Sequence, residues 1–322
     1  MTPNFIFSLW PRVSCGFLQR MYYTGFADEA GASIDVQIKA TKELGWSKIE
    51  SRNIDGVNLT DISDEQFDVV AQKLTEAGVT VNCFGSAIAN WSKDPRKDED
   101  FQYSVAALKR AIPRMRTLGA AMIRGMSFAV VKDAEPDSPE LEKIIFEKVN
   151  HLVKMCADAG VFYMHENCMN YGGMSHEHTL KLLDNVKSPN FKLVFDTANP
   201  VFTDRRIGGK PYRKQSSWEF YANVKEFVEY VHIKDARYIG KSDGIFPKTE
   251  HVFPGEGDGD VEKIVTDLLA NGYDGGFSIE PHLNVVFHDD SVQSADDVRY
   301  SNYVEYGKRF MQLVAKIQGK GQ

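Results

Sequence analysis

Residues 191–200 read FKLVFDTANP, an apolar run that ends directly on an acid. The run at 193–195 has the composition of a buried strand, and Asp196 follows it at once. A carboxylate is costly to bury without a partner. This stretch therefore predicts a core strand whose end needs a compensating group, and it directs attention to the ends of the other strands.

The strand pattern of this stretch recurs along the chain, and helical patterns alternate with it. Strands are expected at residues 22–29, 46–52, 79–87, 120–128, 161–167, 191–199, 230–237 and 275–282. Helices are expected near residues 33–45, 63–78, 98–118, 138–160, 176–186, 217–227, 260–271 and 296–317. The strands lack simple polar alternation, which is typical of a parallel sheet covered on both faces.

Eight strand-then-helix units in about 300 residues predict an α/β fold, a (β/α)8 TIM barrel with its active site at the C-terminal strand ends. A doubly wound sheet would carry a glycine-rich phosphate turn after the first strand, whereas this turn reads ADEAGAS at residues 27–33. We expect residues 21–322 to form a single barrel domain. Residues 1–20 are expected to be a leader, either disordered or an over-long start. Residues 238–259, rich in Gly and Asp, are expected to form a long loop over the strand ends.

The composition indicates a globular protein and excludes several classes of function. Of the 322 residues, 43% are hydrophobic and 26% charged, which is ordinary for a globular chain. The 38 basic and 45 acidic residues give a net charge of −7, which argues against a nucleic-acid partner because phosphates require a positive surface. No run approaches the roughly 18 apolar residues of a membrane helix, and the four cysteines show neither CxxC spacing nor a disulfide framework. We therefore expect a cytoplasmic protein with reduced thiols and no membrane partner, and a homo-oligomer is compatible with this sequence.

Four late strands end on side chains of the kind that ligate metals, namely Glu166, Asp196, His232 and Glu280. In a barrel the C-terminal strand ends converge on one mouth, where three carboxylates would repel one another without a cation. Any one of these residues alone has a simpler interpretation as a helix cap or an ion-pair partner, but four successive strands ending this way indicate a metal site. Mixed histidine and carboxylate ligation suits one divalent ion, with Mn²⁺ favoured and Mg²⁺, Co²⁺, Fe²⁺ or Zn²⁺ as alternatives.

Strand parity extends the site, because side chains two residues apart on a strand share a face. Lys234 shares a face with His232, and His282 shares a face with Glu280. Both are expected to contact a substrate bound at the metal. The alternatives are an ion pair to a neighbouring acid for Lys234 and a hydrogen bond within the site for His282.

The second strand also ends on charged residues, Glu50 and Arg52. Either side chain can bind sugar hydroxyls, and the guanidinium of Arg52 can bind a phosphate or carboxylate. The alternative is a buried ion pair near the barrel mouth.

Together these segments resemble a known family. The segments MHEN (164–167), VFDTAN (194–199), HIKDAR (232–237) and IEPH (279–282) resemble the metal motifs of the sugar phosphate isomerase/epimerase family, the xylose isomerase-like TIM barrels. GFADE (25–29), KIESR (48–52) and PGEGDGDV (254–261) are also similar to family features, so the resemblance covers residues 21 to 317. It implies that Glu166, Asp196, His232 and Glu280 ligate the metal. It also implies that Glu166 and Glu280 serve as the acid/base pair.

One position departs from the family pattern. Many epimerase-like members carry His three residues after the aspartate, where this chain has Asn199. Asn cannot carry a proton as His does, but it can hydrogen-bond a substrate hydroxyl. Arg237 approximates the basic residue that members often carry beyond the metal-binding histidine. The expected substrate-binding residues are therefore Glu50, Arg52, Asn199, Lys234, Arg237 and His282.

The expected function is that of a divalent-metal-dependent isomerase or epimerase in carbohydrate metabolism, acting on a small-molecule sugar or sugar derivative. Such an enzyme removes a proton next to a carbonyl and stabilises the resulting enediolate. The alternatives are a lyase or dehydratase acting on a keto-sugar or keto-inositol, and a non-catalytic metal-containing sugar-binding barrel. An abasic-site endonuclease is disfavoured by the negative charge and by the presence of only eight histidines.

Overall fold

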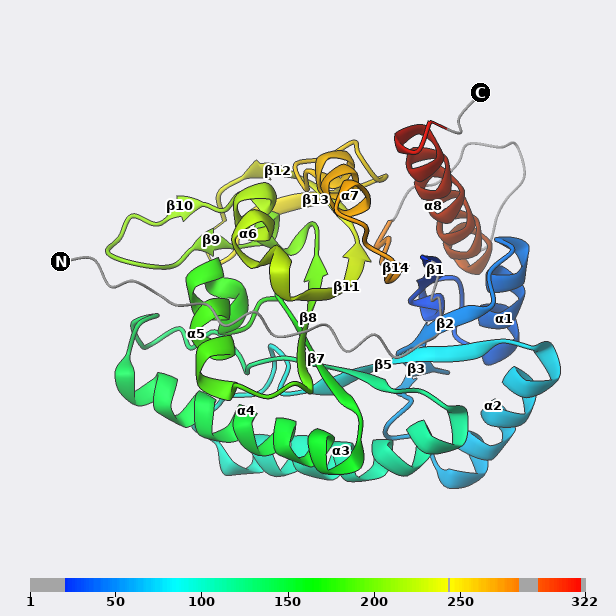
Figure 1. The fold of residues 1–322 in the computed structure, drawn as a ribbon, viewed down its shortest axis with the longest axis horizontal. Coiled ribbons are helices and arrows are strands. Elements are labelled where there is room, and N and C mark those ends of the chain that lie inside the picture. The colour runs from blue at the N-terminus through cyan, green and yellow to red at the C-terminus, as the bar shows by residue number, and fades with distance from the viewer. Residues whose placement is uncertain (1–20, 243, 284–294, 320–322) are drawn as a thin grey trace.

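The computed structural model describes residues 21–242, 244–283 and 295–319, with eight parallel strands at its centre (Figure 1). The strands are β1 (Tyr22–Gly25), β2 (Lys48–Ser51), β5 (Thr80–Ile88), β6 (Met122–Gly125), β7 (Phe162–Glu166), β8 (Phe191–Asp196), β11 (Val228–Ile233) and β14 (Gly276–Ile279). They pair in the order β1-β14-β11-β8-β7-β6-β5-β2, and a parallel bridge from Phe26 to Glu50 joins the regions of β1 and β2. The strands form a nearly closed barrel, which confirms the predicted (β/α)8 fold.

Helices surround the strands in Figure 1, and their positions follow the expected ones closely. They are α1 (Ile34–Glu43), α2 (Asp64–Ala77), α3 (Asp98–Leu118), α4 (Pro139–Ala159), α5 (His176–Val186), α6 (Ser217–Val224), α7 (Val261–Ala270) and α8 (Ala295–Ile317). Short 3-10 helices are η1 (Ala27–Glu29), η2 (Gly172–Met174), η3 (Asn199–Phe202) and η4 (Lys225–Phe227). The leader expected at residues 1–20 lies outside the described residues. No helix of the described part of the chain has the length and apolar character needed to span a membrane.

Local sequence signals fix the ends of these helices. At the start of α2, the Ser63 hydroxyl accepts a hydrogen bond from the Gln66 amide, and the Gln66 side chain accepts one from the Ser63 amide. This reciprocal capping box satisfies two amides that have no partner within the helix. Gly78 ends the helix in the left-handed conformation, with φ of 65°, which a glycine adopts without the steric cost of a Cβ atom.

The segment after β11 differs from the expectation of a long irregular loop. It forms an antiparallel hairpin of β12 (Asp235–Gly240) and β13 (Lys248–Val252). Further short pairs are β3 (Asn53–Ile54) with β4 (Val57–Asn58), and β9 (Asp204–Arg205) with β10 (Arg213–Lys214). The glycines and aspartates of residues 238–259 favour a loop, but the same segment carries residues that favour strands, namely Tyr238, Ile239, Thr249 and Val252.

The Asp235 carboxylate organises the loop that follows the hairpin. It accepts hydrogen bonds from the backbone amides of Gly255, Gly257 and Gly259 at 2.9, 3.0 and 2.9 Å. A Cβ atom at Gly257 would lie only 2.4 Å from Asp235 Oδ1. The motif at residues 254–261 therefore requires glycine because its backbone wraps around a buried carboxylate.

The barrel interior changes from apolar to polar along its axis. A small apolar cluster of Cys83, Met164, Val194 and Tyr230 lies inside the barrel. On three of the strands the residue two positions further along is Glu166, Asp196 or His232. Since alternate residues of a strand share a face, the same inward faces that close the apolar core carry the polar site at the C-terminal end.

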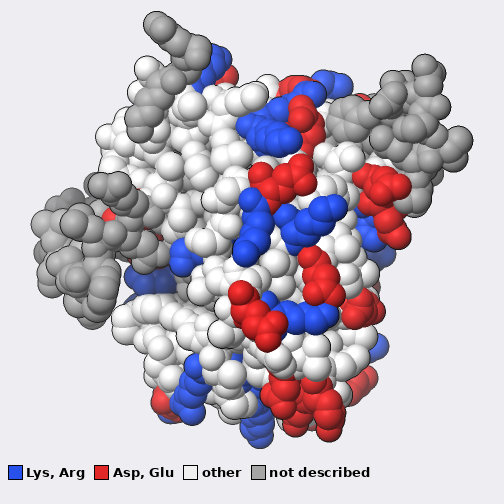
Figure 2. Space-filling view, turned by 90° about the vertical axis from the view of Figure 1, so that its right-hand side faces the viewer, with Lys and Arg blue, Asp and Glu red and all other residues white. Residues whose placement is uncertain are grey.

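Charged side chains of both signs are interspersed on the face shown in Figure 2. Among the described residues visible there, Lys and Arg lie beside Asp and Glu rather than gathering into one basic area. This mixture agrees with the net charge of −7. On this face it differs from the basic surface that nucleic-acid phosphates require.

Candidate metal centre

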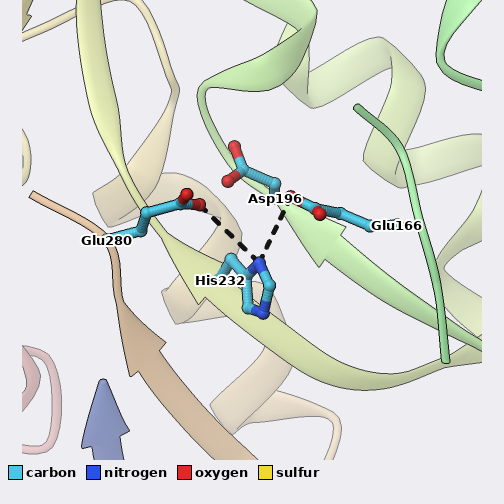
Figure 3. Close-up of side chains that lie close together, drawn as sticks. All are labelled: Glu166, Asp196, His232 and Glu280. Carbon is cyan, nitrogen blue, oxygen red and sulfur yellow. Dashed lines mark hydrogen bonds and ion pairs between the residues drawn. The ribbon is translucent and has the colours of Figure 1, made fainter. Parts of the chain in front are cut away.

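The structure brings the four predicted ligands together at the C-terminal end of the barrel (Figure 3). Glu166 and Asp196 are the last residues of β7 and β8, His232 lies near the end of β11, and Glu280 directly follows β14. All four are buried, and each offers a ligand-type atom within 4.8 Å of the others. His232 Nδ1 lies 3.3 Å from Glu166 Oε1 and 3.8 Å from Glu280 Oε2.

Two basic side chains balance part of the negative charge. Lys234 Nζ lies 2.9 Å from Asp196 Oδ2 and 3.1 Å from Glu280 Oε2. Arg124 on β6 donates a hydrogen bond from Nη1 to Glu166 Oε2 at 3.3 Å. Sequence reasoning missed Arg124, although a charged residue within a predicted core strand was an available signal.

The surroundings shift the pKa values of the Glu166 and Asp196 carboxylates in opposite directions. Burial alone would raise the pKa of Glu166, but Arg124 and His232 outweigh burial and lower this pKa to about 2. Burial raises the pKa of Asp196 to about 6, although Lys234 acts in the opposite direction. Glu166 therefore stays ionised far into the acid range, whereas Asp196 takes up a proton as the pH falls to about 6.

The imidazole of His232 is surrounded by acids. Burial alone would lower the pKa of His232, but Glu50 and Glu166 outweigh burial and raise this pKa to about 10. A metal ligates only the unprotonated nitrogen of a histidine. A metal bound at this site would therefore replace a proton on His232.

The donor set fits a divalent cation. Asp196 Oδ1 accepts hydrogen bonds from the backbone amides of Ala198 and Asn199 at 2.9 and 2.8 Å. Asp196 Oδ2 is buried and, within the described part of the chain, receives no hydrogen bond of acceptable geometry, although it pairs with Lys234. Buried oxygens rarely lack hydrogen bonds, and three carboxylates with one imidazole match the ligands of Mn²⁺, Mg²⁺, Co²⁺, Fe²⁺ or Zn²⁺.

Three further predicted residues contact Glu166 or Glu280. Asn199 Nδ2 donates a hydrogen bond to Glu166 Oε1 at 3.1 Å. Arg52 Nη1 lies 3.3 Å from Glu280 Oε1, and His282 Nε2 lies 3.0 Å from the same oxygen. Together with Lys234, these side chains place hydrogen-bond donors and positive charge around the proposed ligands.

The two remaining residues predicted to bind substrate, Arg237 and Glu50, have different surroundings from the other four. Arg237 is half exposed on the hairpin, where Nη1 lies 3.6 Å from Glu250 and Nη2 donates to the Glu256 carbonyl. The structure therefore does not bring Arg237 into contact with the four ligands. Glu50 is 0% exposed, and its two oxygens lie 3.2 and 3.0 Å from His232 Nε2. Its carboxylate faces a proposed ligand rather than a surface that a sugar can reach.

Comparison with known families and structures agrees with this geometry. The family model of the xylose isomerase-like TIM barrel matches residues 38–300. The chain belongs to this family. A search of curated proteins found no match.

Several solved structures of this family share the fold. A D-tagatose 3-epimerase-like protein is 14% identical, with 93% of this chain and 99% of that chain covered and a TM-score of 0.67. A xylose isomerase-like TIM barrel protein from Mycobacterium smegmatis, solved in complex with magnesium, is 18% identical, with 92% and 98% covered and a TM-score of 0.62. D-allulose 3-epimerase from Methylomonas sp., solved in complex with D-allulose, is 19% identical, with 90% and 97% covered and a TM-score of 0.59. At these identities the likeness shows the barrel fold.

Proposed function

We propose that this family member is a divalent-metal-dependent isomerase or epimerase of a small-molecule sugar or sugar derivative. The observation that carries the proposal is the buried cluster of Glu166, Asp196, His232 and Glu280, with ligand-type atoms within 4.8 Å of one another. The magnesium and the D-allulose with which two of the similar structures were solved support a metal and a sugar here. Mn²⁺ remains the proposed ion.

The two glutamates are proposed to move the proton. Figure 3 shows the Glu166 and Glu280 carboxylates approaching His232 from opposite sides. A divalent cation held by the four residues supplies stabilisation of negative charge as it develops on a substrate oxygen. The lowered pKa of Glu166 keeps this carboxylate ionised, so it can accept a proton, and Glu280 lies on the other side to exchange one. An epimerase uses both residues and exchanges their roles between directions.

Substrate orientation is assigned to the donors around the four ligands. Lys234 and Arg52 present positive charge, while Asn199 and His282 present hydrogen-bonding groups. These groups suit hydroxyl or carbonyl oxygens of a polyhydroxylated ligand. Arg237 can join them only if the hairpin carries it toward the site.

A second candidate function is a lyase or dehydratase acting on a keto-sugar or keto-inositol. Asn199 favours this candidate because it stands where many epimerase-like members carry His. The amide of Asn199 binds Glu166 and cannot transfer a proton itself. A dehydratase begins with the same proton abstraction and then expels a group from the neighbouring carbon.

The test is deuterium incorporation from D₂O into a panel of ketoses, keto-inositols and 3-keto sugars in the presence of Mn²⁺. We expect label at the carbon next to the carbonyl, and a loss of about 10²- to 10⁴-fold in rate for Glu166→Gln and Glu280→Gln. Glu147→Gln, an exposed change on α4 where Glu147 pairs with Lys143, is the matched control and is expected to keep the wild-type rate. Product analysis separates epimerisation from dehydration. If metal and sugar bind without label in any compound, the protein is a non-catalytic binding barrel.

A further inference from the structure

We propose that Glu50 is a positioning residue, which holds the proton of His232 on Nε2 and so leaves Nδ1 free to ligate the metal. The inference rests on the proposed metal centre and assigns Glu50 a role other than the sugar binding expected from its sequence position. It follows from a chain of buried hydrogen bonds inside the barrel.

The chain crosses the barrel beneath the proposed ligands. Thr24 Oγ1 donates to Asn82 Oδ1 at 2.8 Å, and Asn82 Nδ2 donates to the Tyr230 hydroxyl at 2.9 Å. The Tyr230 hydroxyl donates to Glu50 Oε2 at 2.8 Å. Glu50 in turn faces His232 Nε2, at 3.0 Å from Oε2. All five residues are buried, so water does not compete for these bonds.

The chemistry of the groups fixes the direction of each bond. An ionised carboxylate can only accept hydrogen bonds, so both the Tyr230 hydroxyl and His232 Nε2 must donate to Glu50. Tyr230 donates its single hydroxyl proton to Glu50, and its hydroxyl oxygen accepts the hydrogen bond from the Asn82 amide. The contact with Glu50 therefore keeps a proton on Nε2, so the proton that a metal would replace is the one on Nδ1, the nitrogen that faces Glu166.

The opposite nitrogen points at the proposed ligands. Nδ1 of His232 faces Glu166 at 3.3 Å and Glu280 at 3.8 Å. The ring itself is held by edge contacts with Phe26 and Tyr230, with centroid distances of 5.0 and 5.6 Å. Packing therefore restricts the plane of the ring, and Glu50 decides which nitrogen keeps its proton when a metal binds. Carboxylate partners of this kind raise the basicity of a ligating histidine, and their loss typically weakens metal binding about 10- to 100-fold.

The test uses Zn²⁺ as a diamagnetic probe, with protein labelled with ¹⁵N-histidine and the His232 signals assigned from a His232→Asn variant. In zinc-loaded wild type we expect a proton on Nε2 and zinc on Nδ1. Glu50→Gln can turn its amide NH₂ toward the ring, so we expect a rise in the zinc Kd of about 10- to 100-fold and a changed Nε2 signal.

Glu50→Asp keeps the carboxylate, and we expect it to retain the Nε2 proton. Tyr230→Phe removes one bond to Glu50 but not the His232 contact, and we expect it to raise the Kd less than Glu50→Gln.

The outcomes separate this inference from the proposed function. If wild type binds no zinc at His232, the proposed metal centre is wrong. If wild type binds zinc through Nε2, or Glu50→Gln leaves both Kd and the His232 signals unchanged, the role of Glu50 is overturned while the metal centre stands. The wild-type spectrum decides the question even if Glu50→Gln does not fold. A merely structural Glu50 would change stability without changing the zinc Kd or the Nε2 signal of His232.

Discussion

Lys234→Met removes the ammonium that lies between two of the proposed ligands, and its effect should depend on the metal. Lys234 Nζ lies 2.9 Å from Asp196 and 3.1 Å from Glu280, and its side chain is 6% exposed. Burial alone would lower the pKa of Lys234, but these two acids outweigh burial and raise it. Methionine keeps a long unbranched chain in the same space, so the substitution removes mainly the charge.

The magnitude follows from the two distances. With an effective dielectric constant of about 20, a pair of unit charges near 3 Å apart attracts by about 5–6 kcal/mol. The cost of removing Lys from water offsets much of this attraction, and loss of one partner of a buried pair typically costs about 3–5 kcal/mol. We therefore expect the EDTA-treated variant to lose about 3–5 kcal/mol of unfolding free energy relative to wild type. A divalent cation held by the same carboxylates compensates them directly, so saturating Mn²⁺ should narrow this gap.

The assay is urea unfolding of both proteins, with EDTA and with increasing Mn²⁺. Lys154→Met is the control, because Lys154 forms an exposed pair with Asp158 and should change stability by less than about 1 kcal/mol with or without Mn²⁺. A gap between wild type and Lys234→Met that stays constant at every Mn²⁺ concentration would refute the reasoning. It would mean that the ammonium and the metal do not share the same carboxylates.

Two further predictions concern stability. Gly257→Ala should lower the free energy of unfolding in urea by about 1–3 kcal/mol, because its Cβ atom would lie 2.4 Å from Asp235 Oδ1. Gly209→Ala is the control and should be nearly neutral, because no atom lies within 4 Å of its Cβ position. Equal losses in the two variants would contradict the role given to Gly257 in the loop. Burial lowers the pKa of His178 in the folded protein. As the pH falls below about 6.5, the imidazole of His178 is therefore protonated in the unfolded chain before it is protonated in the folded protein. Wild type should therefore lose more stability between pH 7 and pH 5 than His178→Gln, and identical losses would show that His178 does not contribute.

The sequence was sufficient to predict the residues whose environment is set by strand order. Glu166, Asp196, His232 and Glu280 each lie at or beside the C-terminal end of a strand, and the barrel topology brings such ends together whatever the details of packing. The capping box at Ser63 and the left-handed Gly78 were likewise predictable, because both depend on residues within one turn of the helix.

Partners from distant strands were harder to predict. Glu50 lies 182 positions from His232 in the chain, and only the closure of the barrel shows that it faces Nε2 rather than a substrate. The pairing of Arg124 with Glu166 depends in the same way on the register of β6 and β7. The hairpin of β12 and β13 places Arg237 on an exposed edge, which the spacing from His232 alone did not reveal.

The measurement that tests the central claim most directly is anomalous X-ray scattering from crystals grown with Mn²⁺. We predict a single strong peak about 2.0–2.3 Å from oxygen or nitrogen atoms of Glu166, Asp196, His232 and Glu280. A peak only at another acidic group, such as Asp137, Glu142 and His178, or none near His232, would contradict the claim.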